Sequence, residues 1–296
     1  MIRPGRVFRF CLLATGACLL LAACGSRKSA VSPSREYEQK GDEAYFSQNM
    51  EAAIDNYKNA LQVGSSTTAL HNNLGNSFFK ERRFNAAEQS YLDALDLDPE
   101  YLFSLNNLAL TLYSSGDVEG ARRLLEEAKK SFPDVSFLRT TDGYLHHLEG
   151  DRKSALRSFR EAVDINPDSA AALNNLGVLY MEDPGLGEDP LPYLKRATES
   201  GSGNMLFHDS LGWYYYKKGR FADATIEIGK AFLYDPQNVE VRIHYATVLE
   251  WIGKDQEALE QWEAILQQVE DGTTRKHALE HVWEIRGRGV GQEGPG

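Results

Sequence analysis

The sequence predicts an all-α solenoid of about seven helical hairpins. The main observation is a short motif that recurs at a fixed period. LHNNLG begins at residue 70, LNNLA at 105 and LNNLG at 173, so the Asn pairs lie 34 and then 68 residues apart. A fixed period of this size is typical of repeat architectures, in which neighbouring helix pairs stack and bury a continuous core.

Small residues occupy equivalent places along the chain. The first set is spaced by 34 residues, with one step of 35: Gly41, Gly75, Ala109, Gly143, Gly177, Gly212 and Ala246. A second set follows twelve positions later in most repeats: Ala53, Ala87, Ala121, Ala155, Ala224 and Ala258. Small side chains on two successive helices allow the helices to pack closely. Four repeats then close with a Pro, which cannot continue a helix: Pro99, Pro133, Pro167 and Pro236.

This pattern resembles the tetratricopeptide repeat (TPR) family over residues 34–272. The resemblance implies a right-handed superhelical solenoid of about seven TPR hairpins, with repeats that begin near residues 34, 68, 102, 136, 170, 205 and 239. Four repeats carry a Gly at the turn between their helices, where a left-handed backbone is expected: Gly116, Gly150, Gly219 and Gly253. The first two repeats have Gln48 and Arg82 there instead.

The fifth repeat departs from the pattern. Its second helix should begin within Glu182–Pro190, but that segment contains two Pro and two Gly residues and favours a loop. We expect the helix to restart near Leu191 and to keep Ala197. The loop is either a contact site or a tolerated insertion, and insertions in solenoids usually map to loops, which favours the second. Residues 273–286 are expected to form a capping helix and residues 287–296 a flexible tail.

The N-terminus has the layout of a secretory signal over residues 1–23, with three Arg, an apolar stretch and no acid. It ends in Leu21-Ala22-Ala23-Cys24, which resembles the lipobox of bacterial lipoproteins. The resemblance implies that Cys24 carries a covalent lipid (palmitate), followed by a tether over residues 24–33. Gly25 after the cysteine further implies the periplasmic face of the outer membrane of a Gram-negative bacterium.

Charge and motif content argue against nucleic-acid binding and catalysis. The formal net charge is −11, and no Lys/Arg cluster that could neutralise a phosphate backbone is present. The chain lacks a P-loop, a GxSxG elbow and an HExxH motif. His277 and His281 would share a helix face, which is the geometry of two metal ligands, but they have no evident third ligand. We therefore expect no enzyme, no metal and no cofactor other than the lipid.

A partner-binding groove is the main functional candidate. In the TPR family the first helix of each repeat lines a concave groove, and positions 2, 5, 9 and 12 of a repeat share one helix face. Positions 5 and 6 carry the amides Asn72, Asn73, Asn106, Asn107, Asn174 and Asn175. These resemble the asparagine ladder of O-linked GlcNAc transferase, which implies binding of an extended peptide backbone. The alternative is that the amides stabilise contacts between neighbouring repeats.

Ring-bearing residues at positions 2, 9 and 12 also belong to the candidate groove: Phe79, Phe103, Tyr113, Phe137, Tyr144, His147, Trp213 and Tyr216. Such residues dominate binding hot spots, although any single one could instead belong to the core. The sequence thus predicts a lipid-anchored, non-catalytic scaffold in the bacterial envelope. By resemblance to type IV pilus pilotins, assembly of a pilus or secretion apparatus ranks first. Outer-membrane protein insertion, regulation of peptidoglycan hydrolases and, less favoured, a metal-dependent enzyme subunit are the alternatives.

Substitution of Cys24 tests the anchor. Cys24→Ala should release the protein from membranes into the soluble fraction, because the thiol is the only site on which the lipid can be built. Fractionation followed by immunoblotting measures this, with Cys18→Ala as the matched control. Unchanged membrane attachment of Cys24→Ala would overturn the lipidation prediction.

Overall fold

The computed structural model describes residues 32–270 and 272–289, and every regular element within them is a helix. The all-α prediction is confirmed for this part of the chain. The described residues form two compact units, 32–155 and 156–289, which divide within one helix. Each unit is described by itself below. The signal segment, Cys24, most of the tether and residues 290–296 lie outside the described residues.

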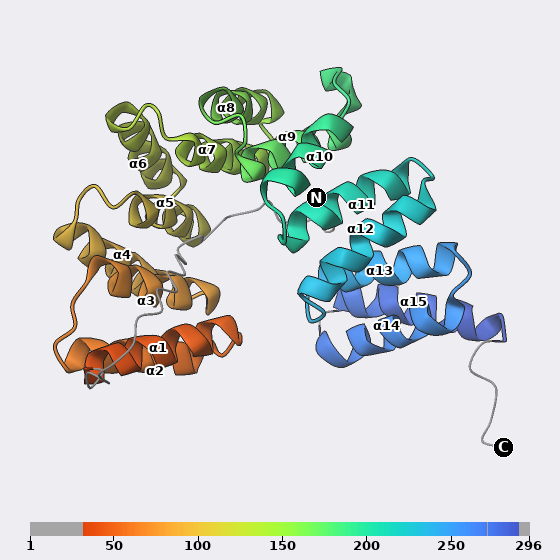
Figure 1. The fold of residues 1–296 in the computed structure, drawn as a ribbon, viewed down its shortest axis with the longest axis horizontal. Helices are drawn as coiled ribbons and strands as arrows, with labels where there is room; N and C mark the ends of the chain where they lie inside the picture. Colours follow the sequence, from red (N-terminus) through yellow and green to blue (C-terminus); the bar gives the residue numbers. More distant parts are fainter. Residues whose placement is uncertain (1–31, 271, 290–296) are drawn as a thin grey trace, which may run out of the picture. The chain divides into compact units, whose positions relative to one another are not determined.

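The first unit contains three complete helical hairpins and the first helix of a fourth. Its helices are α1 (Pro33–Phe46), α2 (Met50–Gln62), α3 (Thr68–Lys80), α4 (Phe84–Leu97), α5 (Leu102–Ser115), α6 (Val118–Ser131), α7 (Ser136–Leu148) and the start of α8 (Arg152–Ile165). Helices that are consecutive from α1 to α7 pack against one another. The first helices α3, α5 and α7 lie on the inner side of the curve that this unit follows, and α4 and α6 on the outer side (Figure 1).

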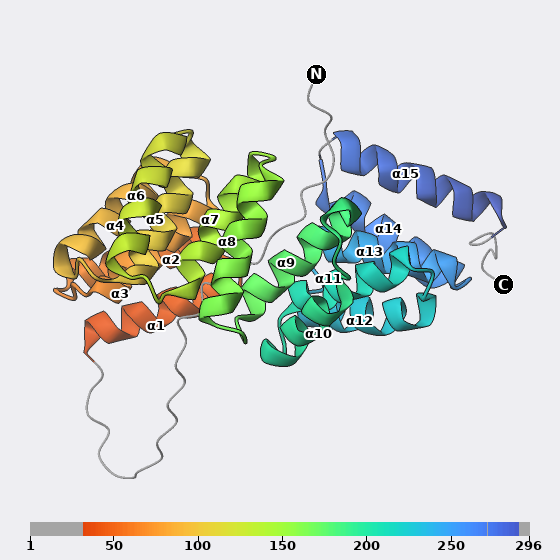
Figure 2. The same cartoon turned by 90° about the horizontal axis from the view of Figure 1, so that it is seen from above.

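The second unit continues the same alternation. After the rest of α8 come α9 (Ala170–Glu182), the 3₁₀ turn η1 (Pro184–Leu186), α10 (Leu191–Ser200), α11 (Met205–Lys217), α12 (Phe221–Tyr234), α13 (Val239–Trp251), α14 (Asp255–Gln268) and α15 (Gly272–Gly287). The pairs α9/α10, α11/α12 and α13/α14 form hairpins, and α15 packs on α14 (Figure 2). The helix α1 begins one residue inside the segment predicted as tether.

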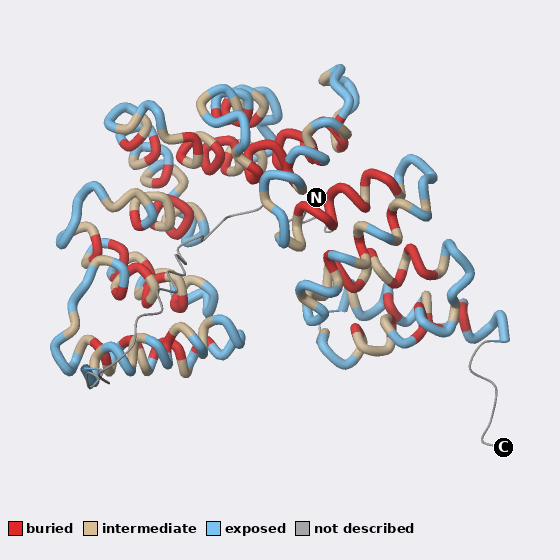
Figure 3. The backbone as a smooth tube through the Cα atoms, in the orientation of Figure 1, coloured by how far each residue is buried: buried red, intermediate tan, exposed pale blue. Residues whose placement is uncertain are grey.

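Close helix pairing within the hairpins explains the small residues of the sequence pattern. A Cβ added to Gly75 would lie 2.6 Å from the ring of Tyr91, and one on Gly212 would lie 2.5 Å from the side chain of Ile228. Real Cβ atoms do not approach so closely, so a larger residue would require the Tyr91 ring to shift at Gly75 and the backbone of α12 to shift at Gly212. The recurring Ala residues of the second helices, such as Ala87 and Ala258, are fully buried. Buried residues lie along the helices, while the turns between them are mostly exposed (Figure 3).

The turns between paired helices adopt a left-handed backbone whether or not they contain Gly. The expected conformation is confirmed for the four Gly residues, whose φ angles lie between 71° and 101°. The first two repeats keep it without Gly, since φ is 61° at Gln48 and 58° at Arg82. A Cβ makes this conformation unfavourable by about 1 kcal/mol or more. These two turns are therefore strained by the repeat geometry that surrounds them.

The fifth repeat has a shortened second helix, as predicted. Pro190 precedes α10, which restarts at Leu191 and spans ten residues. Ala197 remains fully buried, so the repeat keeps its central small residue. The inserted segment contains η1, and Asp183 accepts a hydrogen bond from the Gly185 amide at 3.1 Å. Over the described ranges, no helix is long and apolar enough to cross a membrane.

Replacing a strained turn residue should stabilise the first unit. Arg82→Gly is expected to raise the free energy of unfolding by about 0.5–1 kcal/mol, because Gly adopts φ near 60° without the Cβ clash. The reverse change, Gly150→Ala, should lower it by about 1 kcal/mol. Urea unfolding followed by circular dichroism measures both. A destabilised Arg82→Gly variant would show that the arginine side chain matters more than the turn strain.

Candidate partner-binding site

Hydrogen bonds between neighbouring first helices occupy several of the predicted groove amides. Asn72 on α3 accepts from the Ser104 hydroxyl at 3.1 Å and from the Asn107 amide at 3.2 Å, both on α5. Asn107 also donates to Asn76 at 2.9 Å, and the Tyr91 hydroxyl of α4 donates to the same oxygen at 2.8 Å. One polar cluster thus connects three helices of the first unit. The amides of this cluster hydrogen-bond to other side chains of the protein.

The same kind of hydrogen bond recurs in other repeats. The side chain at position 6 of one repeat bonds to the side chain at position 5 or 9 of the preceding repeat. Asn73 donates to Asp42 at 3.4 Å, and the Thr141 hydroxyl donates to Asn106 at 2.6 Å. In the second unit, His244 Nδ1 lies 2.9 Å from both carboxylate oxygens of Asp209. These bonds favour the alternative interpretation, in which the amides stabilise contacts between repeats.

Burial corrects the peptide-binding prediction for three of the six amides. Asn174 and Asn175 are each 1% exposed, and Asn72 is 7% exposed. These three side chains are therefore closed to a peptide. Asn73, Asn106 and Asn107 remain half-buried.

The predicted aromatic residues of the first unit lie beside a common core cluster. Phe79, Tyr113, Phe137 and Tyr144 are half-buried and pack around the buried residues Ala109, Leu110, Ala121, Leu125, Ala128, Leu138 and Leu145. Phe103 is 40% exposed and stacks on Phe137 with a centroid distance of 5.8 Å and an interplanar angle of 1°. We call Phe79, Phe103, Tyr113, Phe137 and Tyr144 the aromatic surface. Its rings come from α3, α5 and α7.

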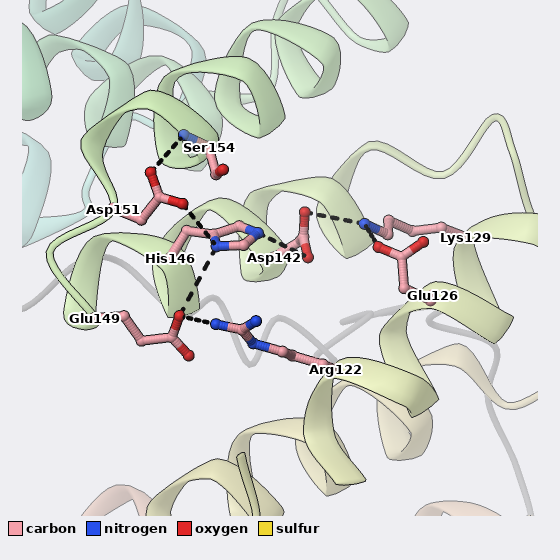
Figure 4. A network of polar contacts seen from close by, with 8 residues as sticks. All are labelled: Arg122, Glu126, Lys129, Asp142, His146, Glu149, Asp151 and Ser154. Atoms are coloured by element: carbon pink, nitrogen blue, oxygen red, sulfur yellow. Dashed lines mark hydrogen bonds and ion pairs between the residues drawn. The ribbon is translucent and has the colours of Figure 1, made fainter. Parts of the chain in front are cut away.

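Ion pairs fix α7, which carries two residues of the aromatic surface. Lys129 on α6 pairs with Asp142 at 3.0 Å, and Arg122 on α6 pairs with Glu149 at the end of α7. His146 lies within this network, 3.9 Å from both Asp142 and Glu149 (Figure 4). Because α6 and α7 are tied at both ends of the interface, the aromatic residues of α7 are held in place.

His147 is a half-buried residue of α7, the helix that carries Phe137 and Tyr144. Burial lowers the pKa of His147 to about 4, and the charge of Arg152 lowers it further in the same direction. The imidazole is therefore uncharged at neutral pH.

A second group of rings lies in the second unit and is larger than the sequence predicted. Trp213 and Tyr216 of α11 stack at 4.7 Å. Trp213 also stacks on His244 of α13 at 4.0 Å. Phe221 of α12 stacks on Trp251 at 4.8 Å and meets Tyr216 edge-on at 5.8 Å. We call these five residues the aromatic cluster. Trp251 is 60% exposed, so the cluster reaches the surface.

Sequence reasoning missed three members of the aromatic cluster. His244 stands at position 6, Trp251 at position 13 and Phe221 at the start of a second helix, so none falls on the face defined by positions 2, 5, 9 and 12. The pair Phe79 and Phe84 in the second repeat could have indicated that Phe221 belongs to the aromatic cluster. It has the same five-residue spacing as Tyr216 and Phe221, and the two pairs meet edge-on at 5.7 Å and 5.8 Å.

A cavity of about 620 Å³ adjoins the inserted loop of the fifth repeat. Its walls carry both signs of charge, including Glu188, Asp189, Lys218 and Arg220. The loop acids bond to nearby rings: Asp189 accepts from the Tyr214 hydroxyl at 3.0 Å and Glu188 from the Tyr193 hydroxyl at 3.1 Å. The carboxylates therefore serve to hold the loop against α10 and α11.

The histidine pair that the sequence singled out lies on α15, which contains no residue of the aromatic surface or of the aromatic cluster. His277 is exposed and His281 half-buried, and their Nε2 atoms are 3.2 Å apart. A hydrogen bond with the Glu250 carboxylate raises the pKa of His281 although burial opposes it. Burial and the neighbouring His281 lower the pKa of His277.

Comparison with known protein families decides the classification. The tetratricopeptide repeat model matches residues 39–101, 74–136 and 149–204, which together make up more than half of the chain. The chain belongs to the tetratricopeptide repeat family. TPR repeats are typical of scaffolds that bind other proteins, so the coarser functional prediction, a protein-interaction scaffold, follows from this membership.

Individual relatives are distant. A TPR repeat-containing protein of Pseudomonas aeruginosa is 26% identical over 195 residues, which cover 65% of this chain and 32% of that protein. This TPR chain thus spans about a third of that relative. A TPR protein from Parabacteroides merdae has a TM-score of 0.55 at 16% identity and covers 86% of this chain and all of its own. The Cut9–Hcn1 assembly of the APC/C has a TM-score of 0.62 at 12% identity, over 84% of this chain and 55% of the other. The two structures support the fold alone.

The buried pair between two TPR repeats should make stability depend on pH. Burial disfavours the charged form of His244, but attraction by the Asp209 carboxylate and their hydrogen bond outweigh it and raise the pKa of His244. Glu240 acts in the same direction and Lys217 against it. Because the pKa is higher in the folded state, the stabilisation is complete below the unfolded pKa, about 6.5, and is lost as pH rises through the folded value.

The measurement is urea unfolding of the wild type and of His244→Gln at about pH 6 and about pH 9. We expect the substitution to cost more free energy of unfolding at the lower pH. Asp209→Asn should cost about 1–3 kcal/mol and should abolish the pH dependence of the His244→Gln effect. An equal cost of His244→Gln at both pH values would contradict the charged pair.

Proposed function

We propose that this chain is a non-catalytic scaffold that binds a partner protein through the half-exposed rings of its first helices. The observation that carries the proposal is the aromatic surface. Four of its rings pack against a core and are half-buried, and the fifth, Phe103, stacks on Phe137 and is 40% exposed. Rings that are held in this way lose little side-chain entropy when a partner covers them.

The hydrogen bonds between repeats change the expected mode of binding. Asn72, Asn106 and Asn107 already bond to groups of neighbouring repeats. A partner's backbone would therefore have to compete with bonds that hold the repeats together. We infer that recognition rests on apolar side chains of the partner, which the rings of the aromatic surface would cover. A few aromatic anchors then supply most of the affinity.

We propose that this scaffold is located in the bacterial envelope and carries a lipid on Cys24. The lipobox-like segment and the signal layout of residues 1–23 support it. A lipid anchor restricts the scaffold to the membrane surface and raises its effective concentration near membrane-bound partners.

For the pathway, we propose assembly of a pilus or secretion apparatus at the outer membrane. The support is the combination of regular repeats and a lipobox-like segment, which is an analogy of fold and address and not of site residues. Insertion of outer-membrane proteins and regulation of peptidoglycan hydrolases require the same kind of scaffold. The partner that is captured distinguishes these three pathways.

Photo-crosslinking from the aromatic surface tests the proposal. A photoreactive residue is placed at Phe103 or Tyr144 in the lipidated chain, the cells are irradiated, and captured proteins are identified by mass spectrometry. We expect capture at both positions. Glu127, an exposed residue on α6 of the outer side, is the matched control. A second control combines the photoreactive residue at Phe103 with Phe137→Ser, which should reduce capture about tenfold or more.

The outcome separates the levels of the proposal. Capture of a secretin or pilus component supports both the surface and the pathway. Capture of an insertase subunit or a hydrolase supports the surface and replaces the pathway. If Glu127 captures a partner and the aromatic surface does not, binding takes place on the outer helices and the proposed surface is wrong.

A further inference from the structure

The paired histidines of α15 have the geometry of two ligands around one metal ion. His277 and His281 are one helical turn apart, and their Nε2 atoms lie 3.2 Å from each other. Two nitrogens bound tetrahedrally to one ion at about 2.0–2.1 Å are separated by about 3.3 Å. In the structure this distance is that of a hydrogen bond, so one Nε2 carries a proton that a metal ion bound by both nitrogens would displace. The spacing of the two nitrogens already matches that of two ligands of one ion.

Two residues of other helices contact the ring of His281. Its Nδ1 lies 2.8 Å from a carboxylate oxygen of Glu250 on α13. A carboxylate behind a histidine fixes the other ring nitrogen as the metal-binding atom and makes it more basic. The ring also stacks on Trp262 at 4.3 Å, and Trp262 is fully buried. His281 is thus oriented from two sides by residues of other helices.

Glu250 is itself held in place by further contacts. The indole Nε1 of Trp262 donates to Glu250 at 2.6 Å, and Arg288 pairs with the carboxylate at 3.3 Å. His277 meets the Trp262 ring edge-on at 5.4 Å. These contacts connect α13, α14 and α15. Both imidazoles therefore pack against side chains of other helices.

We propose that His277 and His281 bind one divalent transition-metal ion of the zinc, nickel or copper class. Imidazole ligands favour these ions over Mg²⁺ and Ca²⁺. The segment His277-Ala278-Leu279-Glu280-His281 also has the residue order H-x-x-E-H, in which both histidines bind zinc in one class of metallopeptidases. Among the residues that the structure describes, no three side chains of the metal-ligating types gather into one site. Water would complete the coordination of the bound ion.

This inference goes beyond the proposed scaffold function and does not depend on it. The histidine pair lies on the helix that follows the last repeat, whereas the aromatic surface lies on α3, α5 and α7. A metal ion bound to α15 would connect this helix more firmly to α13 through His281 and Glu250. The expected consequence is stabilisation of the C-terminal helix by the ion.

Isothermal titration of the chelator-treated full chain with ZnCl₂ tests the site. We expect one Zn²⁺ per chain and no corresponding binding of Mg²⁺. His277→Ala should weaken Zn²⁺ binding at least tenfold, because it removes one of two protein ligands. Glu250→Gln should weaken it about 10–100-fold through the loss of the orienting carboxylate. Lys276→Ala, an exposed substitution on the same helix, is the matched control and should leave the affinity unchanged.

A second measurement locates the ion independently of affinity. Cu²⁺ bound at His281 should quench the fluorescence of Trp262, whose ring is in contact with that histidine. The quenching should persist in Trp283→Phe and disappear in His277→Ala, with circular dichroism confirming that each variant is folded. Zn²⁺ binding that is equal in the wild type and in His277→Ala, or absent from the wild type, would overturn the proposal.

Discussion

Close contact between the two helices of each hairpin is the constraint on which the rest of the structure depends. At Gly75 and Gly212 the partner helix approaches so closely that a methyl group would collide with Tyr91 or with Ile228. Small residues at these places set the distance between paired helices, and the period of 34 residues repeats that distance along the chain. The turn that joins each pair must then take one conformation. Gln48 and Arg82 adopt it in spite of their Cβ atoms.

This repeated distance determines what polar residues can do on the first helices. Successive first helices are near enough for position 6 of one repeat to bond to position 5 or 9 of the preceding one, as Asn107 does with Asn72 and Asn76. For Asn72, Asn106 and Asn107 the neighbouring repeat supplies the hydrogen-bond partners that buried amides need. These three amides consequently act as connectors between repeats. His244 and Asp209 form the charged version of the same contact.

The same spacing leaves the larger side chains of the first helices incompletely covered. Phe103 and Phe137 stack on one another, but their ring contact does not bury Phe103, which keeps 40% of its area exposed. Trp251 is in a similar position in the second unit, where it stacks on Phe221 and stays 60% exposed. Partly covered rings on rigid helices are what a protein-binding scaffold requires, since they combine apolar area with a fixed position.

The sequence by itself determined the helical class, the repeat period, the turn positions and the interruption of the fifth repeat, because each follows from local residue properties. Gly and Pro act within a turn, and Ala53 or Ala197 is recognisable from spacing alone. Only the tertiary structure decided what the amides contact and which rings join the aromatic cluster. Asn175 and Asn107 occupy the same repeat position, yet one is 1% exposed and the other is half-buried. Their burial depends on side chains from other repeats, and spacing along one helix carries no information about those.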